Sequence, residues 1–435
     1  MDISIIGGGY VGLVTAACLS NNGHTVICVE RSKEKIKKLS TGKTPIFEPG
    51  LEELIKLNLG SGKLSFTTDL SYAVKNSEAV FIAVGTPMIE ESEGVDLKDI
   101  CNVFKELAYI LKDNTLVIVK STVPVGTNRM LRDLVRGMNP TLNFDIVSNP
   151  EFLRQGSAIK DFENPDRIII GSETKASRDI MESVYRIEKL SKVPILHTGL
   201  ESAELIKYAA NAFLATKVSF INEIAALCEK IDADVNIVSK GLGLDDRIGA
   251  RFLDAGPGYG GSCFPKDAAA LVHLGKEKKV PQRVTEAGIA ANNATKQRMI
   301  INIINLCNGC VEDKTILVLG VTFKADTGDM REAPSLTIIP ALMENGANIR
   351  IVDPVGQQEG LSLFPDAKWY DDVYMAAKNI DCMIVLTDWQ DFKELDLYRI
   401  ASNMRKKCIG DLRNIFPRET LKKVGFESIF QVGKK

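Results

Sequence analysis

Short apolar runs, each followed by a segment with helical spacing, recur through the first two hundred residues of the chain. Such runs occur at residues 2–6, 24–30, 79–84, 116–120 and 144–148. Runs of this length and character are typical of strands buried on both faces. Helical patterns lie between them, as over residues 13–22. Alternating strands and helices predict a parallel sheet covered by helices on both faces.

A different pattern occupies the middle of the chain. Apolar residues at helical spacing run over residues 201–231 and again over 283–306, which predicts two long helices. The alternation then returns, with strands expected at 314–320, 348–353 and 381–387 and a helix at 335–345. We therefore predict an α/β protein with two doubly wound, Rossmann-like domains, 1–200 and 311–435, joined by a helical central segment, 201–310.

Length and composition agree with this organisation. A chain of 435 residues, 45% hydrophobic and 25% charged, is too long for one ordinary core and is typical of a globular protein. The formal net charge is −2, with basic residues dispersed, which argues against nucleic acid or an anionic membrane as a partner. No apolar run approaches the ~20 residues of a spanning helix. The first residues lack a signal-peptide pattern, so a soluble, cytoplasmic protein is expected.

The nine cysteines show no disulfide framework. Their number is odd and most lie in apolar segments, which is typical of reduced thiols in a cytosolic protein. Cys307 and Cys310 form a CxxC pair. Because there is no second such pair and only three histidines accompany it, we predict no metal site.

The sequence GGGYVG at residues 7–12 is a GxGxxG pattern between an expected strand and an expected helix, and Glu30 ends the next strand. Such glycines bring the backbone close to a pyrophosphate at a helix N-terminus, and the acid accepts hydrogen bonds from the adenosine ribose. An acid here repels a 2′-phosphate, which favours NAD over NADP, although Arg31 and Lys35 lie nearby. A glycine turn without a ligand is the alternative. The cofactor contacts expected here are Gly7, Gly9, Val11, Gly12, Glu30 and Lys35.

Hydroxyl side chains follow two of the expected strands: Thr86 follows one, and Ser121 and Thr122 follow another. Ligands of doubly wound sheets bind beyond the carboxyl ends of the strands. These hydroxyls are therefore candidates for cofactor contacts, and helix N-capping is an equal alternative for Ser121.

Lys207 and Asn211 lie four residues apart in an expected helix and so share one face. Apolar neighbours would lower the pKa of Lys207 and suit it to stabilise an alkoxide. The alternative is a lysine that extends along the helix surface into water.

Residues 256–267, GPGYGGSCFPKD, set Cys263 between a run of glycines and the expected start of a helix. The helix dipole and Lys266 favour the thiolate form of this cysteine, which is a nucleophile. A small buried residue is the alternative interpretation. Asp267 lies one helical turn after Cys263, where it would hold a water molecule or orient Lys207.

Together these motifs resemble the UDP-glucose/GDP-mannose dehydrogenase family of nucleotide-sugar dehydrogenases, over nearly the whole chain. The matching segments are GGGYVGL (7–13), STVPVGT (121–127), SNPEFLRQGSAIKDFENPDRIIIG (148–171), ELIKYAANAFLATKVSFINEIA (204–225), RIGARFLDAGPGYGGSCFPKD (247–267) and FKADTGDMREAPS (323–335). The resemblance implies an NAD-dependent four-electron oxidation of a sugar C6 alcohol to a carboxylate. In that reaction Cys263 would carry first a thiohemiacetal and then a thioester.

The resemblance also implies roles for individual residues. Lys207 and Asn211 would stabilise oxyanions, Asp267 would activate or hold water, Glu151 would serve in acid–base chemistry, and Thr122 would add a supporting hydroxyl. Further cofactor contacts would be Gln155, Lys266 and Arg331, besides Thr86 and Thr122. Nucleotide-sugar contacts would be Glu151, Phe152, Leu153, Arg154, Lys207, Asn211, Phe252, Leu253, Asp254, Ala255, Gly256, Gly260 and Lys324, with Arg247 supplied by a neighbouring subunit.

Position 155 departs from the family pattern, because many relatives carry glutamate there. Glutamine forms hydrogen bonds but is not a base, so no catalytic-base role is expected for Gln155.

The resemblance also implies an assembly of several copies of the chain. The helix from Glu201 would form the contact of a homodimer or a higher homo-oligomer.

Within the family, GPGYGG and Phe264 resemble the branch that acts on UDP-glucose, so the resemblance implies UDP-glucose as the first substrate and UDP-glucuronate as its product. Other UDP-hexoses and GDP-mannose follow. A two-electron hydroxyacid-type dehydrogenase would share the plan without needing Cys263. A non-catalytic NAD sensor would keep the glycines and have no use for Lys207 or Asp267.

Overall fold

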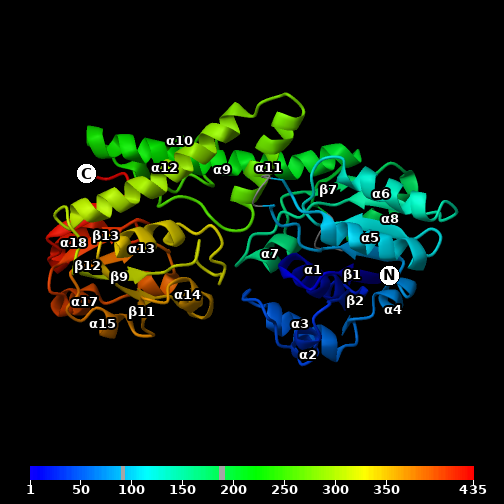
Figure 1. Ribbon diagram of the computed structural model, residues 1–435, viewed down its shortest axis with the longest axis horizontal. Helices are drawn as coiled ribbons and strands as arrows, with labels where there is room; N and C mark the ends of the chain where they lie inside the picture. Colours follow the sequence, from blue (N-terminus) through cyan, green and yellow to red (C-terminus); the bar gives the residue numbers. More distant parts are fainter. Residues whose placement is uncertain (90–93, 186–191) are drawn as a thin grey trace. The chain divides into compact units, whose positions relative to one another are not determined.

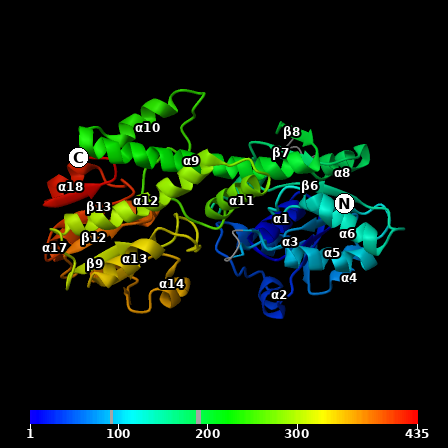
Figure 2. The ribbon, with the colours of Figure 1, turned by 45° about the horizontal axis from the view of Figure 1, so that its top comes forward.

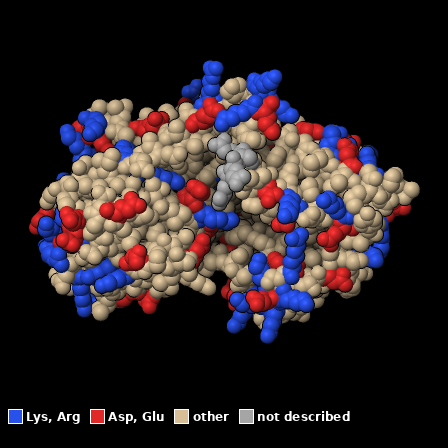
Figure 3. Space-filling model, viewed as in Figure 1, with Lys and Arg blue, Asp and Glu red and all other residues tan. Residues whose placement is uncertain are grey.

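Two sheets organise the chain, one in each of the units Met1–Ala210 and Asn211–Lys435. The computed structural model, shown in Figure 1, describes residues 1–89, 94–185 and 192–435. Within these ranges no helix combines the length and the apolar character needed to cross a membrane. On the face drawn in Figure 3, basic and acidic side chains are interspersed.

The sheet of the first unit has eight strands in the order β3-β2-β1-β4-β5-β6-β7-β8. Their bounds are β1 (Asp2–Ile6), β2 (Thr25–Val29), β3 (Leu64–Thr67), β4 (Ala79–Ile82), β5 (Leu116–Val119), β6 (Asp145–Ser148), β7 (Ile168–Gly171) and β8 (Ile195–Thr198). Among the described strands, neighbours are parallel except β6 and β7, which pair antiparallel through Ser148 and Gly171. This pair corrects the expectation of a wholly parallel sheet.

Helices cover both faces of this sheet. They are α1 (Tyr10–Asn21), α2 (Lys33–Leu39), α3 (Leu51–Gly60), α4 (Leu70–Lys75), α5 (Lys98–Ile110), α6 (Thr127–Met138), α7 (Ala158–Glu163) and α8 (Lys175–Tyr185). Successive residues of β4 enter different cores: Phe81 packs with α1, α3, α7 and α8, and Ile82 packs with α4, α5 and α6. Because side chains alternate along a strand, a strand that is apolar at every position must be buried on both faces.

The sheet of the second unit has six strands in the order β11-β10-β9-β12-β13-β14, and neighbouring strands in it are parallel. Their bounds are β9 (Thr315–Leu319), β10 (Asn348–Val352), β11 (Lys368–Trp369), β12 (Cys382–Val385), β13 (Cys408–Asp411) and β14 (Ser428–Gln431). The helices that alternate with them are α13 (Ser335–Glu344), α14 (Gln357–Leu363), α15 (Val373–Ala376), α16 (Gln390–Lys393), α17 (Leu397–Asn403) and α18 (Arg418–Val424).

The helical middle of the chain consists of α9 (Leu200–Ile231), α10 (Val235–Gly243), α11 (Phe264–Glu277) and α12 (Arg283–Leu306). Helix α9 begins in the first unit and continues into the second. Helix α12 packs along the second sheet against β13 and β14, as Figures 1 and 2 show from two directions. Two Rossmann-like domains and long central helices confirm the predicted fold class.

Candidate active site

The glycine turn after β1 leaves the start of α1 open. A Cβ on Gly12 would lie 1.8 Å from the carbonyl oxygen of Gly7, so the helix packs closely on the turn. Gly9 is the N-cap of α1; no side chain caps the helix there, and a Cβ on Gly9 would meet nothing within 4 Å. The first N–H groups of a helix attract anions. The turn therefore fits the pyrophosphate of a dinucleotide.

Glu30 lies at the end of β2, next to this turn. Its Oε1 accepts the N–H of Ser32 at 3.0 Å, and its Oε2 lies 3.6 Å from Lys35 Nζ. Arg31 pairs with Asp99 at 3.2 Å. Arg31 is thus neutralised by an acid other than Glu30, whereas Lys35 pairs with Glu30 itself.

The loops after β4 and β5 are tied together by hydroxyl groups. The Thr86 hydroxyl donates to the Thr122 carbonyl at 2.7 Å, and the Ser121 hydroxyl donates to the Val84 carbonyl at 2.7 Å. Helix α6 begins later, after Gly126. Ser121 therefore links two loops and does not cap a helix.

Lys207 and Glu151 form a buried ion pair. Lys207 Nζ lies 3.1 Å from Glu151 Oε1, and the side chains are only 4% and 7% exposed. Glu151 Oε2 accepts the N–H of Leu153 at 2.5 Å, and Lys207 Nζ lies 5.3 Å from the centre of the Phe152 ring. The alternative of a lysine extending along the helix surface is therefore wrong.

A second buried lysine, Lys120, lies at the end of β5 and was not among the expected site residues. Its Nζ donates to Asn149 Oδ1 at 3.1 Å, and Asn149 in turn accepts from Tyr185 at 2.6 Å. Burial lowers the pKa of Lys120 to about 8, and both Glu151 and Lys207 are close enough to influence it. The only sequence signal for Lys120 is a lysine directly after the apolar run 116–119.

The loop that contains Gln155 is held by a buried carboxylate that sequence reasoning also missed. Glu48 accepts the N–H groups of Gly156 and Ala158 at 2.6 and 2.7 Å, and it accepts the Tyr10 hydroxyl. Burial, followed by the contact with Glu48, raises the pKa of Tyr10. Tyr10 belongs to the glycine motif, so Glu48 connects the dinucleotide turn with the loop after β6. Arg154 on this loop is exposed and pairs with Asp161 at 2.5 Å.

In the second unit, Cys263 is the N-cap of α11, as predicted, and its side chain is half-buried. Pro265 occupies the first turn of the helix. Asp267 is 1% exposed, and its two oxygens accept from Asn211 Nδ2 at 2.6 Å and from Lys266 Nζ at 2.7 Å. Asp267 thus orients an amide and a cation close to the start of the helix. Asn211 itself lies four residues after Lys207 on α9, so the two side chains leave one helical face.

The glycine-rich segment before Cys263 is fastened to two long helices. Asn222 of α9 accepts the N–H of Gly256 at 2.8 Å, and Asn292 of α12 exchanges hydrogen bonds with the backbone of Tyr259 at 2.8 and 3.1 Å. A Cβ on Gly260 would lie 2.2 Å from the Glu332 carbonyl oxygen. Side chains of both long helices therefore hold the loop that precedes Cys263. Sequence reasoning predicted neither asparagine.

The remaining expected substrate residues of this unit lie around the same loop and the end of the second sheet. The Phe252 ring stacks at a tilt on Phe264, with centroids 5.8 Å apart. Leu253 and Ala255 are buried, whereas Asp254 is exposed. Lys324 Nζ lies 5.9 Å from the Phe323 ring centre.

Three arginines remain to be placed, and sequence reasoning did not predict one of them. Arg331 pairs with Asp329 at 2.6 Å, which raises its pKa, and Cys263 adds to the same effect. Arg247 is highly exposed and pairs with Asp245 at 2.6 Å. Arg413, after β13, was not expected; it donates to the carbonyls of Leu386 and Phe323, beside Gly256.

Three known protein domains match the chain, one after another along the sequence. They are the NAD binding domain of the UDP-glucose/GDP-mannose dehydrogenase family at residues 1–189, its central domain at 201–294 and its UDP binding domain at 317–418. The UDP-glucose 6-dehydrogenase of Rhizobium meliloti (strain 1021) is 45% identical over 428 residues, which cover 98% of each chain.

Solved structures agree with these matches. A UDP-glucose dehydrogenase from Pyrobaculum islandicum superposes with a TM-score of 0.91 at 32% identity, over 100% of this chain and 98% of that one. A UDP-D-ManNAc dehydrogenase from Pyrococcus horikoshii gives a TM-score of 0.86 at 26% identity, over 100% and 99% of the two chains. Because the three domain matches and the full-length relatives span nearly all of its residues, the chain belongs to the UDP-glucose/GDP-mannose dehydrogenase family.

Proposed function

We propose that this enzyme oxidises UDP-glucose to UDP-glucuronate in two NAD-dependent steps, with Cys263 as a covalent nucleophile. The observation that carries the proposal is Cys263 itself, held at the N-terminus of α11 by a glycine loop that Asn222 and Asn292 fasten. A two-electron hydroxyacid dehydrogenase needs no such cysteine. The relative from Rhizobium meliloti, a UDP-glucose 6-dehydrogenase, supports the choice of substrate.

The dinucleotide is held by the first unit. Gly7, Gly9, Val11 and Gly12 would contact its pyrophosphate, and Glu30 its adenosine ribose, with Lys35, Thr86, Thr122 and Gln155 nearby along the same sheet edge. Lys266 and Arg331 are proposed as further contacts. When bound, NAD accepts a hydride from the sugar C6 in each of the two oxidations.

The covalent chemistry belongs to the side chains of this protein. The Cys263 thiolate bonds to the C6 aldehyde carbon, and the aldehyde oxygen takes up a proton to give a thiohemiacetal. After the second oxidation the sulfur carries a thioester. Water then adds to its carbonyl carbon and the carbon–sulfur bond breaks. One proton of the water restores the Cys263 thiol, the other is lost to a base, and the carboxylate is released.

Lys207 and Asn211 stabilise the oxyanions of these steps, because a cation and an amide donor on one helical face offer charge and hydrogen bonds to one oxygen. Glu151 exchanges protons during hydrolysis, since it is already hydrogen-bonded to Lys207. Asp267 holds the water and orients Asn211. Thr122 supplies a supporting hydroxyl.

The sugar nucleotide is assigned to two segments and two further single residues. The segments are Glu151–Arg154 and Phe252–Gly256, and the single residues are Gly260 and Lys324. We propose 1–200, 201–310 and 311–435 as the cofactor, central and nucleotide-sugar domains. The UDP binding domain match at residues 317–418 supports the last of these.

We also propose a homodimer built on α9. Phe213, Phe220 and Leu227 recur at seven-residue spacing on this helix and are 66%, 49% and 53% exposed. Exposed apolar side chains in a row mark interaction surfaces, and a second copy of the chain is the partner that a repeating helical stripe fits. Arg247, exposed on its own chain, would then reach the substrate of the partner. A cytoplasmic location is proposed because the nine cysteines, all within the described ranges, form no disulfide bond.

The test is the yield of NADH per sugar in a panel of UDP-glucose, other UDP-hexoses and GDP-mannose. Two NADH per UDP-glucose are expected; a yield of one would show a two-electron enzyme. Cys263→Ser should lower turnover at least about 10³-fold, as removal of a nucleophile does in other covalent enzymes. Cys310→Ser, which changes an exposed cysteine, is the matched control and should retain full activity.

A further inference from the structure

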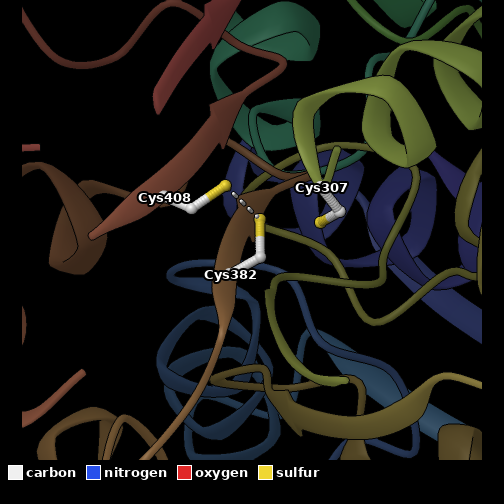
Figure 4. Close-up of side chains that lie close together, drawn as sticks. All are labelled: Cys307, Cys382 and Cys408. Atoms are coloured by element: carbon white, nitrogen blue, oxygen red, sulfur yellow. Dashed lines mark hydrogen bonds between the residues drawn. The ribbon is translucent and has the colours of Figure 1, made fainter. Parts of the chain in front are cut away.

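Three cysteines that are far apart in the sequence meet inside the second unit. Cys307 caps the C-terminus of α12, Cys382 begins β12 and Cys408 begins β13. Their sulfur atoms all lie within 4.8 Å of one another, and the residues are 5%, 0% and 5% exposed. Figure 4 shows the three side chains pointing toward a common centre. We call Cys307, Cys382 and Cys408 the thiol cluster.

The fold builds the thiol cluster from strand register and helix packing. Met383 pairs with Ile409 across β12 and β13, so Cys382 and Cys408, one residue earlier on each strand, lie side by side. Both belong to the core cluster on the α12 face of the sheet, and α12 ends above them at Cys307. Cys408 Sγ donates to Cys382 Sγ at 3.4 Å.

A basic side chain lies beside the thiol cluster. Lys314 donates to the carbonyl oxygens of Cys307 and Cys310, which holds its ammonium group beside the end of α12. A cation at this place favours negative charge on the nearby sulfur atoms. Lys406, two residues before Cys408, is a second basic residue close to the cluster in the sequence.

We propose that the thiol cluster is a binding site for one Cu(I) ion, coordinated by the three sulfur atoms. Thiolate ligands select soft metals such as Cu(I) and Zn²⁺. Structural Zn²⁺ is almost always bound by four ligands in a tetrahedron. Across the described parts of the chain, however, only three side chains of the ligand types converge here, and all three are buried. Three sulfurs satisfy Cu(I) without a fourth ligand.

The proton and charge balance of binding is simple. Cu(I) replaces the protons of the thiols, so three protons leave when three thiols become ligands, and the complex carries two negative charges. Burying such charge is unfavourable unless cations lie nearby. Lys314, held beside the end of α12, supplies one such cation. No electron is transferred, so no oxidant is required.

The experiment uses a full-length parent in which the three cysteines that are not buried are removed: Cys101→Ser, Cys263→Ser and Cys310→Ser. Cu(I) is supplied without oxygen as its bicinchoninate complex, and the metal bound per chain is counted after gel filtration. We expect one Cu(I) per parent chain, a higher melting temperature with the metal, and X-ray absorption that shows sulfur neighbours alone. The readout is metal content, so it is independent of the dehydrogenase activity.

Variants of the parent separate the thiol cluster from other thiols. Cys382→Ala and, at the helix end, Cys307→Ser should each reduce binding from one ion to none. Cys228→Ala, a buried cysteine of the same core outside the thiol cluster, should retain one ion. Circular dichroism identifies any variant that fails to fold. If Cys382→Ala does not fold, the copper content of Cys307→Ser tests the proposal. Absence of copper from the parent, or equal binding by Cys307→Ser and the parent, would overturn the proposal. So would a Cys382–Cys408 disulfide, seen as a loss of two mass units, in place of metal.

Discussion

Lys207 Nζ lies 3.1 Å from Glu151 Oε1, with both side chains almost fully excluded from water. The carboxylate comes from the loop after β6 and the ammonium from α9. Each ion of such a buried pair is stabilised by the other, because desolvation disfavours either ion alone. The pair therefore serves both the integrity of the first unit and the proposed chemistry, and the two contributions are separable by substitution.

Lys207→Met should destabilise the protein by about 3–5 kcal/mol, because it leaves a buried carboxylate without its cation. The double variant Lys207→Met with Glu151→Gln should recover most of that loss, since no unpaired charge remains. Neither should oxidise UDP-glucose at an appreciable rate. Urea unfolding measures the first effect and NADH formation the second. A double variant as unstable as the single one would contradict the importance of the pair.

Lys120 predicts a pH dependence of stability. Its pKa is lowered from 10.5 to about 8, so the unfolded chain binds the proton more tightly than the folded one. The free energy of unfolding should therefore rise between pH 8 and pH 10 relative to that of Lys120→Met, in which this group is absent. The expected change is on the order of 3 kcal/mol over the full window.

Urea unfolding of both proteins at several pH values measures this difference. Lys63→Met, which removes an exposed lysine, controls for the loss of a positive charge. A constant difference between wild type and Lys120→Met from pH 7 to pH 10 would show that Lys120 keeps its proton in the fold.

Gly9→Ala tests the dinucleotide turn with little risk to folding, since its Cβ would meet no protein atom within 4 Å. The methyl group would instead occupy the space where a pyrophosphate approaches the helix N-terminus. We expect NADH affinity to fall at least tenfold, as measured by fluorescence titration, with an unchanged melting temperature. Gly60→Ala, at the end of α3 and equally open, should bind NADH normally. Normal binding by Gly9→Ala would place the pyrophosphate elsewhere.

The proposed dimer is tested by a charge in the apolar stripe of α9. Phe213→Glu with Phe220→Glu should convert the dimer to monomer, because two carboxylates would be buried at a contact between identical helices. Sedimentation velocity at micromolar concentration measures the change. Tyr109→Glu alters an equally exposed aromatic residue on α5 and should leave the dimer intact. If both variants sediment like the wild type, the subunit contact lies on another surface.

Local patterns determined much of this protein. The predicted helix at 283–306 coincides with α12, and the strands at 2–6 and 348–353 agree with β1 and β10 within one residue. These elements are readable because the spacing of apolar residues reports which side of a segment is buried. The glycine turn and the cysteine at the start of α11 are local for the same reason. Their shape depends on glycine and proline a few residues away.

Tertiary structure decided which segments become neighbours. Three features depend on residues brought together from distant positions. They are the antiparallel pairing of β7 with β6, the hydrogen bond of Lys120 to Asn149, and the hydrogen bonds that Glu48 accepts from the backbone of residues 156 and 158. The thiol cluster shows this most clearly, since the CxxC at 307–310 gave no hint of Cys382 and Cys408. Periodicity records burial along one segment, whereas register and strand order arise from packing between segments, which no single stretch of sequence encodes.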